Sequence, residues 1–440
     1  MKTSPTLLAT LALAFAAPVT NAAKFKNIGY FMEWGTYERN FHPFDLDWDR
    51  YTHINYAFGK PNPNGTVSLF DAEAAVNHRY LDHGDPNNTD TTNAYGNFGQ
   101  INKLKRQFRN TRFGLSIGGW TLSDQFSGIA STETGRRTFA KSSVDLMLDL
   151  GLDFIDLDWE YPVEGGNDQP PVPHRPDDIK NYVALLKAIR DEYKRVPFKA
   201  ELSVASPAGP SYYSHWDFPS ICGQLDHINI MTYDFSGSWN TVVDHMANLY
   251  PDPNNPSGEG FSAHGAVQAY IQGGCPSEKI VLGVPLYGYS FEGTTGLYGK
   301  FTQPTVGSWK DSLGTWDYKD LPQQGATEYF DDVTKAAYSY DAAKKIWTSY
   351  DSPKSFAAKL AYIKQYNLGG TMYWASDADA KAGSARSLVT QAYNFYGQAN
   401  MAFSTNNLDY PTSHYVNIRN GAGPSPPTTT PTLAPPISTP

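Results

Sequence analysis

The stretch GLDFIDLDWEYP, which runs from Gly151 to Pro162, decides how the fold of the whole chain is interpreted. Asp156, Asp158 and Glu160 occupy alternate positions in it, and apolar residues stand between them. Because successive side chains of a β-strand point to opposite faces, the three carboxylates share one face and the apolar residues share the other. A strand of this kind fits a parallel barrel, whose outer face packs on helices and whose inner face meets the barrel axis.

Three inward carboxylates at this spacing cannot all stay ionised in a low-dielectric interior, because desolvation and like charges both raise their pKa values. Glu160 comes last, at the C-terminal rim where barrel enzymes place their chemistry, so we expect it to be protonated and to act as a general acid. Asp153 has the opposite parity, and we expect it to have a structural role in hydrogen bonding. A purely structural network and a divalent-metal site are the alternatives. Three acids from one strand make a poor cation cage, so no metal and no other cofactor is expected.

The rest of the chain alternates short apolar runs with amphipathic segments such as Asp177–Arg195 and Ser352–Tyr366. Strands that alternate with helices predict a parallel sheet, and eight such units predict an α/β fold of the (β/α)8 TIM-barrel type. A doubly wound open sheet is the alternative. The predicted strands lie within Asn27–Trp34, Thr52–Phe58, Arg112–Trp120, Gly151–Tyr161, Lys199–Ser206, His227–Phe235, Lys279–Phe291 and Gly369–Ser376.

One spacing is irregular, because about 60 residues rich in Gly, Tyr, Trp and Thr separate the seventh run from the next predicted helix. A structureless loop of that length is rare inside a compact domain, so we expect a small inserted domain over 292–350, between strands seven and eight. The catalytic barrel is expected over 23–400. Residues 401–440 then form a tail, whose Pro- and Thr-rich end at 423–440 is typical of a stiff linker.

The N-terminus and the overall charge indicate where the chain works. Residues 1–22 are typical of a secretory signal peptide, since Lys2 precedes an apolar run, Leu7 to Ala17, that is too short to span a bilayer. The mature chain is therefore expected to be secreted, monomeric and free of the membrane. The formal charge of the full 440-residue chain is −9, which makes nucleic acid an unfavourable partner. Sequons at Asn64 and Asn87 lie in turn-rich sequence and are candidate N-glycosylation sites.

Several motifs in the right order make the sequence similar to glycoside hydrolase family 18, the chitinases. The acidic stretch matches the family signature as Asp153-x-x-Asp156-x-Asp158-x-Glu160. The resemblance covers about Lys24 to Phe395 and implies a (β/α)8 barrel with an α+β insertion after the seventh strand. The other matching motifs are SIGGW (Ser116–Trp120), MTYDF (Met231–Phe235), GVPLYG (Gly283–Gly288) and GGTMYWASD (Gly369–Asp377).

The resemblance implies an enzyme that hydrolyses β-1,4 bonds in chitin or chitooligosaccharides with help from the substrate. The N-acetyl carbonyl of the sugar attacks its own anomeric carbon to give an oxazolinium ion, while Glu160 protonates the leaving oxygen and later activates water. Asp158 would orient the N-acetyl group, and Asp156 would share a proton with Asp158. An endo-β-N-acetylglucosaminidase acting on N-glycans and a non-catalytic chitin-binding lectin on the same fold are the alternatives.

The family match also implies roles for residues at other strand ends. Tyr233 and Asp234 would hold the N-acetyl group as part of the catalytic set. Trp374 would form the floor under the distorted sugar, and Tyr30 and Ser116 would support the buried aspartates. The full set of implied substrate-binding residues is Tyr30, Ser116, Gly119, Trp120, Tyr161, Met231, Trp239, Tyr287 and Trp374, with Trp120 and Trp239 as further sugar platforms.

Two positions depart from the family pattern. Phe154 follows the first signature aspartate where glycine is usual, and its parity would place a bulky ring on the barrel floor. Tyr289 replaces the arginine of a Tyr-Gly-Arg motif, so a cation that would touch sugar hydroxyls is missing. Cys222 and Cys275 precede the sixth and seventh strands by a few residues, a placement compatible with a disulfide as well as with free thiols.

Overall fold

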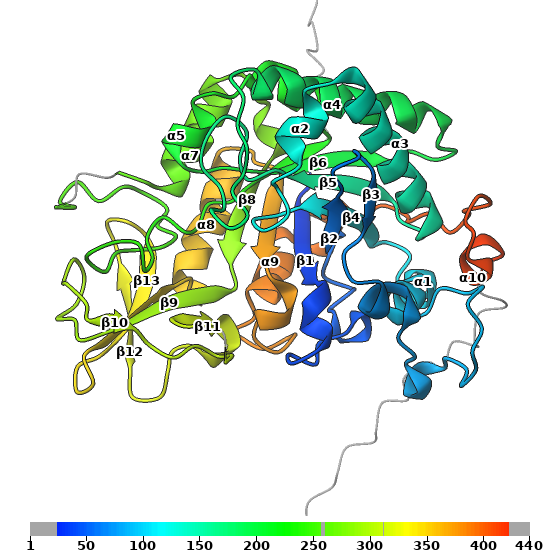
Figure 1. Ribbon diagram of the computed structural model, residues 1–440. Helices are drawn as coiled ribbons and strands as arrows, with labels where there is room; N and C mark the ends of the chain where they lie inside the picture. Colours follow the sequence, from blue (N-terminus) through cyan, green and yellow to red (C-terminus); the bar gives the residue numbers. More distant parts are fainter. Residues whose placement is uncertain (1–23, 257–259, 311, 422–440) are drawn as a thin grey trace, which may run out of the picture.

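The computed structural model describes residues 24–256, 260–310 and 312–421. A barrel and a smaller sheet beside it dominate this part of the chain (Figure 1). The predicted signal peptide, 1–22, and the predicted linker, 423–440, lie outside the described residues and stay predictions.

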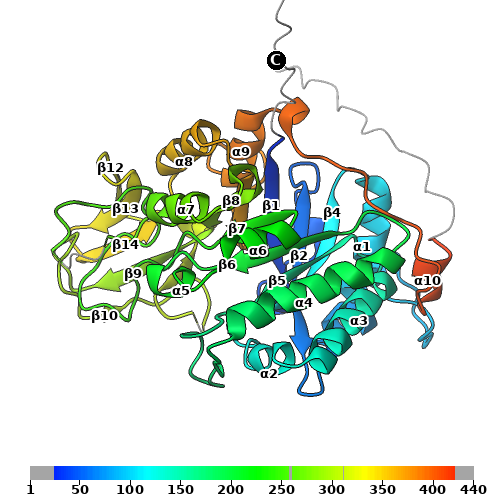
Figure 2. The ribbon, with the colours of Figure 1, turned by 90° about the horizontal axis from the view of Figure 1, so that it is seen from above.

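Parallel strands form a closed barrel with helices around its outside (Figures 1 and 2). Neighbouring strands follow chain order, and β1 pairs with both β2 and β15, which closes the sheet. The predicted (β/α)8 fold is confirmed. The barrel strands are β1 (Lys26–Met32), β2 (His53–Pro61), β4 (Arg112–Gly118), β5 (Phe154–Asp158), β6 (Glu201–Ser206), β7 (His227–Ile230), β8 (Ile280–Pro285) and β15 (Gly370–Trp374), and a short β3 (Val67–Leu69) runs antiparallel to the end of β2.

Helices form where apolar residues recur at helical spacing behind a capping residue. In α8, Phe356, Leu360 and Ile363 are fully buried on one face, and Ser352 caps the N-terminus by accepting from the backbone N–H of Ser355. The helices are α1 (Gly96–Gln107), α2 (Phe126–Ala130), α3 (Glu133–Asp149), α4 (Asp178–Glu192), α5 (Pro210–Tyr213), α6 (Phe218–Gln224), α7 (Ala263–Gln272), α8 (Pro353–Gln365), α9 (Leu388–Tyr396) and α10 (Val416–Arg419).

Strand β5 separates acids from apolar residues as its alternation predicts. Ile155 and Leu157 are fully buried in the main core between strands and helices. Trp159 continues this outer face and stacks on Phe126 of α2, with ring centroids 5.5 Å apart. Burial of each such side chain contributes about 1.5–3 kcal/mol, so the outer face holds the strand in a fixed orientation. The carboxylates are thereby directed toward the barrel axis.

The second sheet begins earlier than expected, at Tyr287 rather than at residue 292. Strand β8 ends at Pro285, which has no N–H to continue a ladder, and the chain then leaves the barrel as β9. The sheet lies between the seventh and eighth barrel strands, has the order β10-β9-β14-β13-β12, and pairs β11 with β9. Its strands are β9 (Tyr287–Glu292), β10 (Gln303–Pro304), β11 (Thr315–Asp317), β12 (Thr327–Asp331), β13 (Ala336–Asp341) and β14 (Ile346–Tyr350).

Residues 401–421 pack on the barrel, so the barrel unit extends beyond the predicted boundary at residue 400. The side-chain amide of Asn406 donates to the carbonyls of Lys105, Phe108 and Thr111, each at 3.0 Å. The first belongs to the last turn of α1 and the second to its C-cap residue, where intrahelical partners run out. Tyr410 is buried as well. The polar sequence of this segment gave no periodic signal, because its role is to cap a helix end.

Candidate active site

A cavity of about 480 Å³ opens at the C-terminal ends of the barrel strands. Asp158 and Glu160 reach it from β5 and the residues that follow, and Tyr233 and Asp234 reach it from the chain after β7. Its apolar walls are Tyr30, Trp34, Phe58, Phe70, Trp120, Leu122, Ala205, Met231 and Trp374. The motifs that are far apart in the sequence therefore meet in one cleft.

Asp156 lies below the cleft, at the centre of the barrel, and accepts hydrogen bonds from four strands. The Tyr30 hydroxyl of β1 and the Ser116 hydroxyl of β4 donate to Oδ2 at 2.7 and 2.8 Å. The Ser203 hydroxyl of β6 and the Asn229 amide of β7 donate to Oδ1 at 2.6 and 3.4 Å. Burial raises the pKa of Asp156, and these donors counteract part of the shift. Asp156 is therefore fixed in place by uncharged partners.

Asp158 lies two positions after Asp156 on the same face of β5, closer to the cleft, and its environment is different. Its Oδ1 is buried without a hydrogen-bond partner among the described residues. Burial, the charge of Glu160 and the charge of Asp156 together raise the pKa of Asp158 well above its usual value. A protonated Asp158 with an open acceptor position can bind a polar group that enters the cleft.

Glu160 is the last acid of the series and the one nearest the opening of the barrel. Its backbone N–H donates to the hydroxyl of Ser123 at 2.8 Å, which fixes the peptide. Burial raises the pKa of Glu160 to about 7, a hydrogen bond from Tyr161 lowers it, and the charge of Asp234 raises it. A carboxyl with this pKa holds a proton near neutral pH and can also release it, which suits a general acid and base.

The aromatic wall of the cleft comes from three strand ends. The Trp374 ring lies 5.7 Å from Phe58, almost parallel to it at 20°, and 5.5 Å from Tyr30. The Trp34 ring is a third neighbour of Trp374, with ring centroids 6.2 Å apart. Sequence reasoning missed Trp34 and Phe58 as lining residues, although each closes a predicted strand run and therefore sits at the rim.

Several predicted site residues lie beside the cavity rather than in its lining. Ser116 acts on Asp156, as described above. A Cβ on Gly119 would lie 2.6 Å from the Phe58 ring, so glycine permits that ring to pack. Tyr161 stacks on Tyr212, 4.4 Å between centroids. The hydroxyl of Tyr287 donates to Asp234 at 2.6 Å.

The two outer tryptophans differ in position. Trp120 lines the cavity and is 48% exposed. Trp239 is 61% exposed and packs edge-on against Tyr289, with centroids 5.8 Å apart. A sugar platform at Trp239 would thus lie to the side of the cavity, toward the insertion.

The remaining predicted residues lie far from the cleft. Asp153 is fully buried in an ion pair with Lys105 at 2.8 Å and accepts from the backbone N–H of Phe113 at 2.9 Å. A disulfide joins Cys222 to Cys275. Asn64 and Asn87 are exposed, and their glycosylation stays a prediction.

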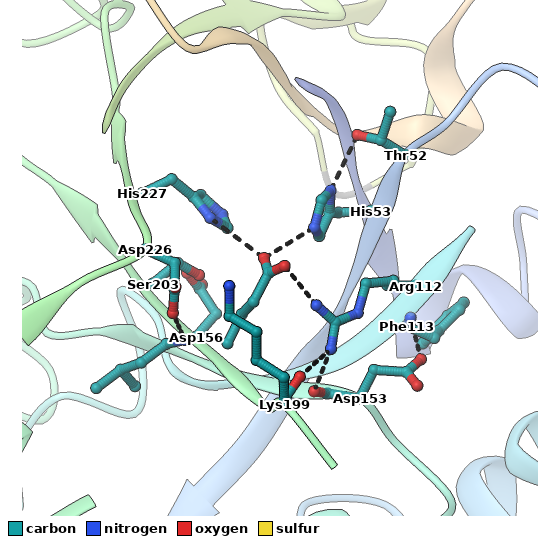
Figure 3. A network of polar contacts seen from close by, with 12 residues as sticks. Thr52, His53, Arg112, Phe113, Asp153, Asp156, Lys199, Ser203, Asp226 and His227 are labelled. Atoms are coloured by element: carbon teal, nitrogen blue, oxygen red, sulfur yellow. Dashed lines mark hydrogen bonds and ion pairs between the residues drawn. The ribbon is translucent and has the colours of Figure 1, made fainter. Parts of the chain in front are cut away.

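At the N-terminal end of the barrel, Glu201 of β6 lies among basic side chains. Figure 3 shows His53, Arg112 and His227 converging there from different strands. His53 Nε2 lies 3.0 Å from Glu201, His227 Nδ1 lies 3.9 Å away, and the Arg112 guanidinium donates directly to the carboxylate. Sequence analysis did not identify this cluster, because each strand contributes a single inward residue to it.

Phe154 fills the space between this floor and Asp156. It pairs with Gly114 of β4, and a Cβ on Gly114 would lie 2.3 Å from the Phe154 ring. The ring also packs edge-on against His53, with centroids 5.5 Å apart. The missing side chain at Gly114 therefore makes room for the bulky residue that departs from the family signature.

Two general features bear on function. Within residues 24–256, 260–310 and 312–421, His, Cys, Asp and Glu side chains form no group of three that could bind a metal ion. No helix in that part of the chain has the length and apolar character needed to cross a membrane.

Comparisons with known proteins place the chain in a family. Residues 26–379 match the model of the glycosyl hydrolases family 18. The chain is 41% identical over 436 residues to "Chitinase 1" of Aphanocladium album, covering 96% of this chain and 99% of the relative. It is 41% identical to "Endochitinase 1" of Metarhizium robertsii, covering 94% and 96%. The catalytic domain of psychrophilic chitinase B from Arthrobacter TAD20 superposes with a TM-score of 0.80 at 29% identity, covering 88% of this chain and 99% of that domain. With a match to its model over most of the barrel, the chain belongs to the glycosyl hydrolases of family 18.

Proposed function

We propose that this glycoside hydrolase is a secreted, monomeric chitinase that cleaves β-1,4 bonds between N-acetylglucosamine units with retention of configuration. Relatives named chitinase and endochitinase at 41% identity over nearly the whole chain support this substrate class. The aromatic walls of the cleft also support it, because indole and phenol faces stack on the apolar faces of sugar rings. The observation that carries the mechanism is the single inward face of β5 and the two residues that follow it, which presents Asp156, Asp158 and Glu160 in order toward the cleft.

The proposed reaction begins with a protonated Glu160. Its proton passes to the glycosidic oxygen as the bond to the anomeric carbon breaks, and the acetamide oxygen of the same sugar forms the new bond to that carbon. The resulting oxazolinium ion is opened by water, whose proton returns to the Glu160 carboxylate. The enzyme then regains its starting protonation state, and the two displacements give retention.

Other side chains position the acetamide in this scheme. Asp158 uses its unpartnered Oδ1 to accept from the acetamide N–H, while Asp156 shares a proton with it and is kept in place by its four donors. Tyr233 and Asp234 bind the N-acetyl group on the side of its carbonyl oxygen. The stacking surfaces are Trp374 under the reacting sugar and Trp120 and Trp239 farther along, with Met231 in the wall.

The test measures release of chitooligosaccharides from colloidal chitin by wild type and by Glu160→Gln. We expect soluble products from the wild type and a loss of about 10²–10⁴-fold in the variant, because general acid catalysis contributes on that order. Binding of chitin without cleavage would favour a lectin instead. Cleavage of N-glycoproteins alone would favour an endo-β-N-acetylglucosaminidase.

A further inference from the structure

The peptide that carries Glu160 lies just past the end of its strand. Strand β5 ends at Asp158, and its pairing with β4 stops where Gly118 faces Asp158. One further backbone bond follows, from the N–H of Gly119 to the carbonyl of Asp158 at 2.7 Å. The N–H of Glu160 then donates to a side chain, the hydroxyl of Ser123, at 2.8 Å. Because a buried N–H needs a partner, this hydroxyl takes the place of a strand carbonyl.

The Ser123 hydroxyl is itself held in one orientation by its neighbours. The side chain is fully buried. Besides accepting from Glu160, the hydroxyl lies 2.9 Å from the carbonyl oxygen of Gly119 and 3.2 Å from that of Asp158, so its proton can go to either of them. The carbonyl of Ser123 accepts from the N–H of Phe126, the first residue of α2, at 3.3 Å. The serine is therefore fixed through both its side chain and its backbone.

The loop that contains Ser123 also supplies part of the cleft wall. Gly118 has a φ of 110°, and a Cβ at this position would lie 2.2 Å from the carbonyl oxygen of Asp158. Glycine therefore lets the loop pass close to the end of β5. Trp120 comes two residues later and lines the cavity. Ser123 then binds the loop to the Glu160 peptide, so a wall residue and the acid are connected through a few bonds.

We propose that Ser123 is a positioning residue for the reaction: its hydroxyl fixes the Glu160 peptide, and through it the carboxyl group, relative to the loop that carries Trp120. The inference rests on the proposed function, in which Glu160 gives a proton to the glycosidic oxygen. Because the Ser123 side chain is fully buried, it acts through Glu160 rather than by touching the sugar. Proton transfer requires hydrogen-bond distance, so a displaced acid slows the chemical step more than it weakens binding.

Two variants of the full chain test the inference on a soluble chitooligosaccharide. Ser123→Ala leaves the N–H of Glu160 without its partner and frees the peptide to shift. We expect kcat to fall about tenfold to a hundredfold, while KM stays within about twofold of wild type, because the walls that bind the sugar are unchanged. Ser123→Cys keeps the size of the side chain but is a weak hydrogen-bond partner, so it should lose kcat in the same way without leaving a cavity.

Ser413 provides the matched control, because it is also buried and its hydroxyl also joins two backbone groups. It donates to the carbonyl of Asp149 at 2.7 Å and accepts from the N–H of Tyr415 at 3.2 Å. Ser413→Ala should lower the melting temperature but leave kcat and KM as in wild type.

Three results would overturn the inference. They are a folded Ser123→Ala with wild-type kcat, a loss that lies in KM alone, and an equal fall of kcat in Ser413→Ala. If Ser123→Ala does not fold, Ser123→Cys decides by the same criteria. A wild type that does not cleave the oligosaccharide would refute the proposed function instead.

Discussion

Two glutamates at opposite ends of one barrel have pKa values displaced in opposite directions. At the rim, burial and the charge of Asp234 raise the pKa of Glu160 to about 7. On the floor, burial would raise the pKa of Glu201 too, but the hydrogen bonds and charges of His53 and Arg112 overcome it and hold the pKa well below the usual range. Desolvation is common to both sites. The difference lies in which side chains surround each carboxyl group.

The environments of the two glutamates differ mainly in positive charge. Burial lowers the pKa of both His53 and His227, whereas the Arg112 guanidinium is a permanent cation beside Glu201. The acids nearer the rim meet hydroxyl groups and an amide instead, as Asp156 does. The group that exchanges a proton in the proposed reaction is thus kept among uncharged donors and other acids, and Glu201 is paired with a fixed charge.

Replacing each glutamate by glutamine should separate catalysis from structure. Glu160→Gln cannot deliver a proton, and we expect kcat/KM to fall about 10²–10⁴-fold. Glu201→Gln makes the same side-chain replacement on the floor, so it should keep kcat/KM within about threefold of wild type whenever it is folded. Initial rates on a chitooligosaccharide, normalised to folded protein, measure both. Comparable losses in the two variants would mean that the floor takes part in the reaction.

Removing the cation from the floor should cost stability. Arg112→Met leaves the Glu201 carboxylate, whose side chain is only 14% exposed, without its fixed partner. Breaking a fully buried pair in this way costs about 3–5 kcal/mol of unfolding free energy, and we expect a loss toward the lower end of that range. Unfolding in denaturant at neutral pH measures the loss. The double variant Arg112→Met/Glu201→Gln should recover most of it, because no buried charge is left unpaired. Strictly additive losses would argue against a direct pair.

The pH dependence of activity should reflect the titration of Glu160 at the rim and not that of Glu201 on the floor. In the proposed reaction Glu160 must hold a proton for the first step, and with a pKa of about 7 it loses that proton as the pH rises above neutrality. We expect kcat/KM to fall roughly tenfold per pH unit on the alkaline side. Glu201→Gln should leave this limb where it is. A limb displaced by more than about half a unit in that variant would show that the two ends are electrostatically coupled.

The rim could be predicted from the sequence and the floor could not, for a physical reason. Asp156, Asp158 and Glu160 lie on a single strand, so strand periodicity alone assigns them to one face. In contrast, Glu201 and Arg112 come from different strands, each as one polar residue at a strand start. Only the register across the barrel brings them together, and a local pattern does not contain that register.

The boundary between the barrel and the second sheet could not be placed from the sequence for a similar reason. Aromatic and aliphatic residues continue from β8 through Tyr287 into β9, and the end of β8 at Pro285 is set by where the barrel sheet stops, not by a change in composition. Phe154 needed Gly114 on the neighbouring strand before its bulk could be explained. Wherever the fit depends on a partner strand, the sequence gives the candidate residue but not its contact.

The two glutamates should also affect stability with opposite dependence on pH. A carboxyl whose folded pKa is raised favours the folded state at low pH, and this contribution is lost as the pH rises through the folded pKa, here about 7 for Glu160. A carboxyl whose folded pKa is lowered, such as Glu201, contributes stability that is present above the unfolded pKa and is lost as the pH falls through the folded pKa.

Thermal unfolding of wild type and both glutamine variants at about pH 5 and pH 8 measures these opposite pH dependences. Glu160→Gln removes a buried group that is ionised at pH 8. The unfolding free energy of the variant minus that of wild type should therefore be more positive at pH 8 than at pH 5, by about 1–3 kcal/mol. Glu201→Gln should be destabilised at both values, since its lowered pKa keeps the wild-type carboxylate ionised and paired throughout. A Glu160→Gln difference that does not change with pH would mean that its carboxyl group titrates normally, and the contrast between rim and floor would then rest on Glu201 alone.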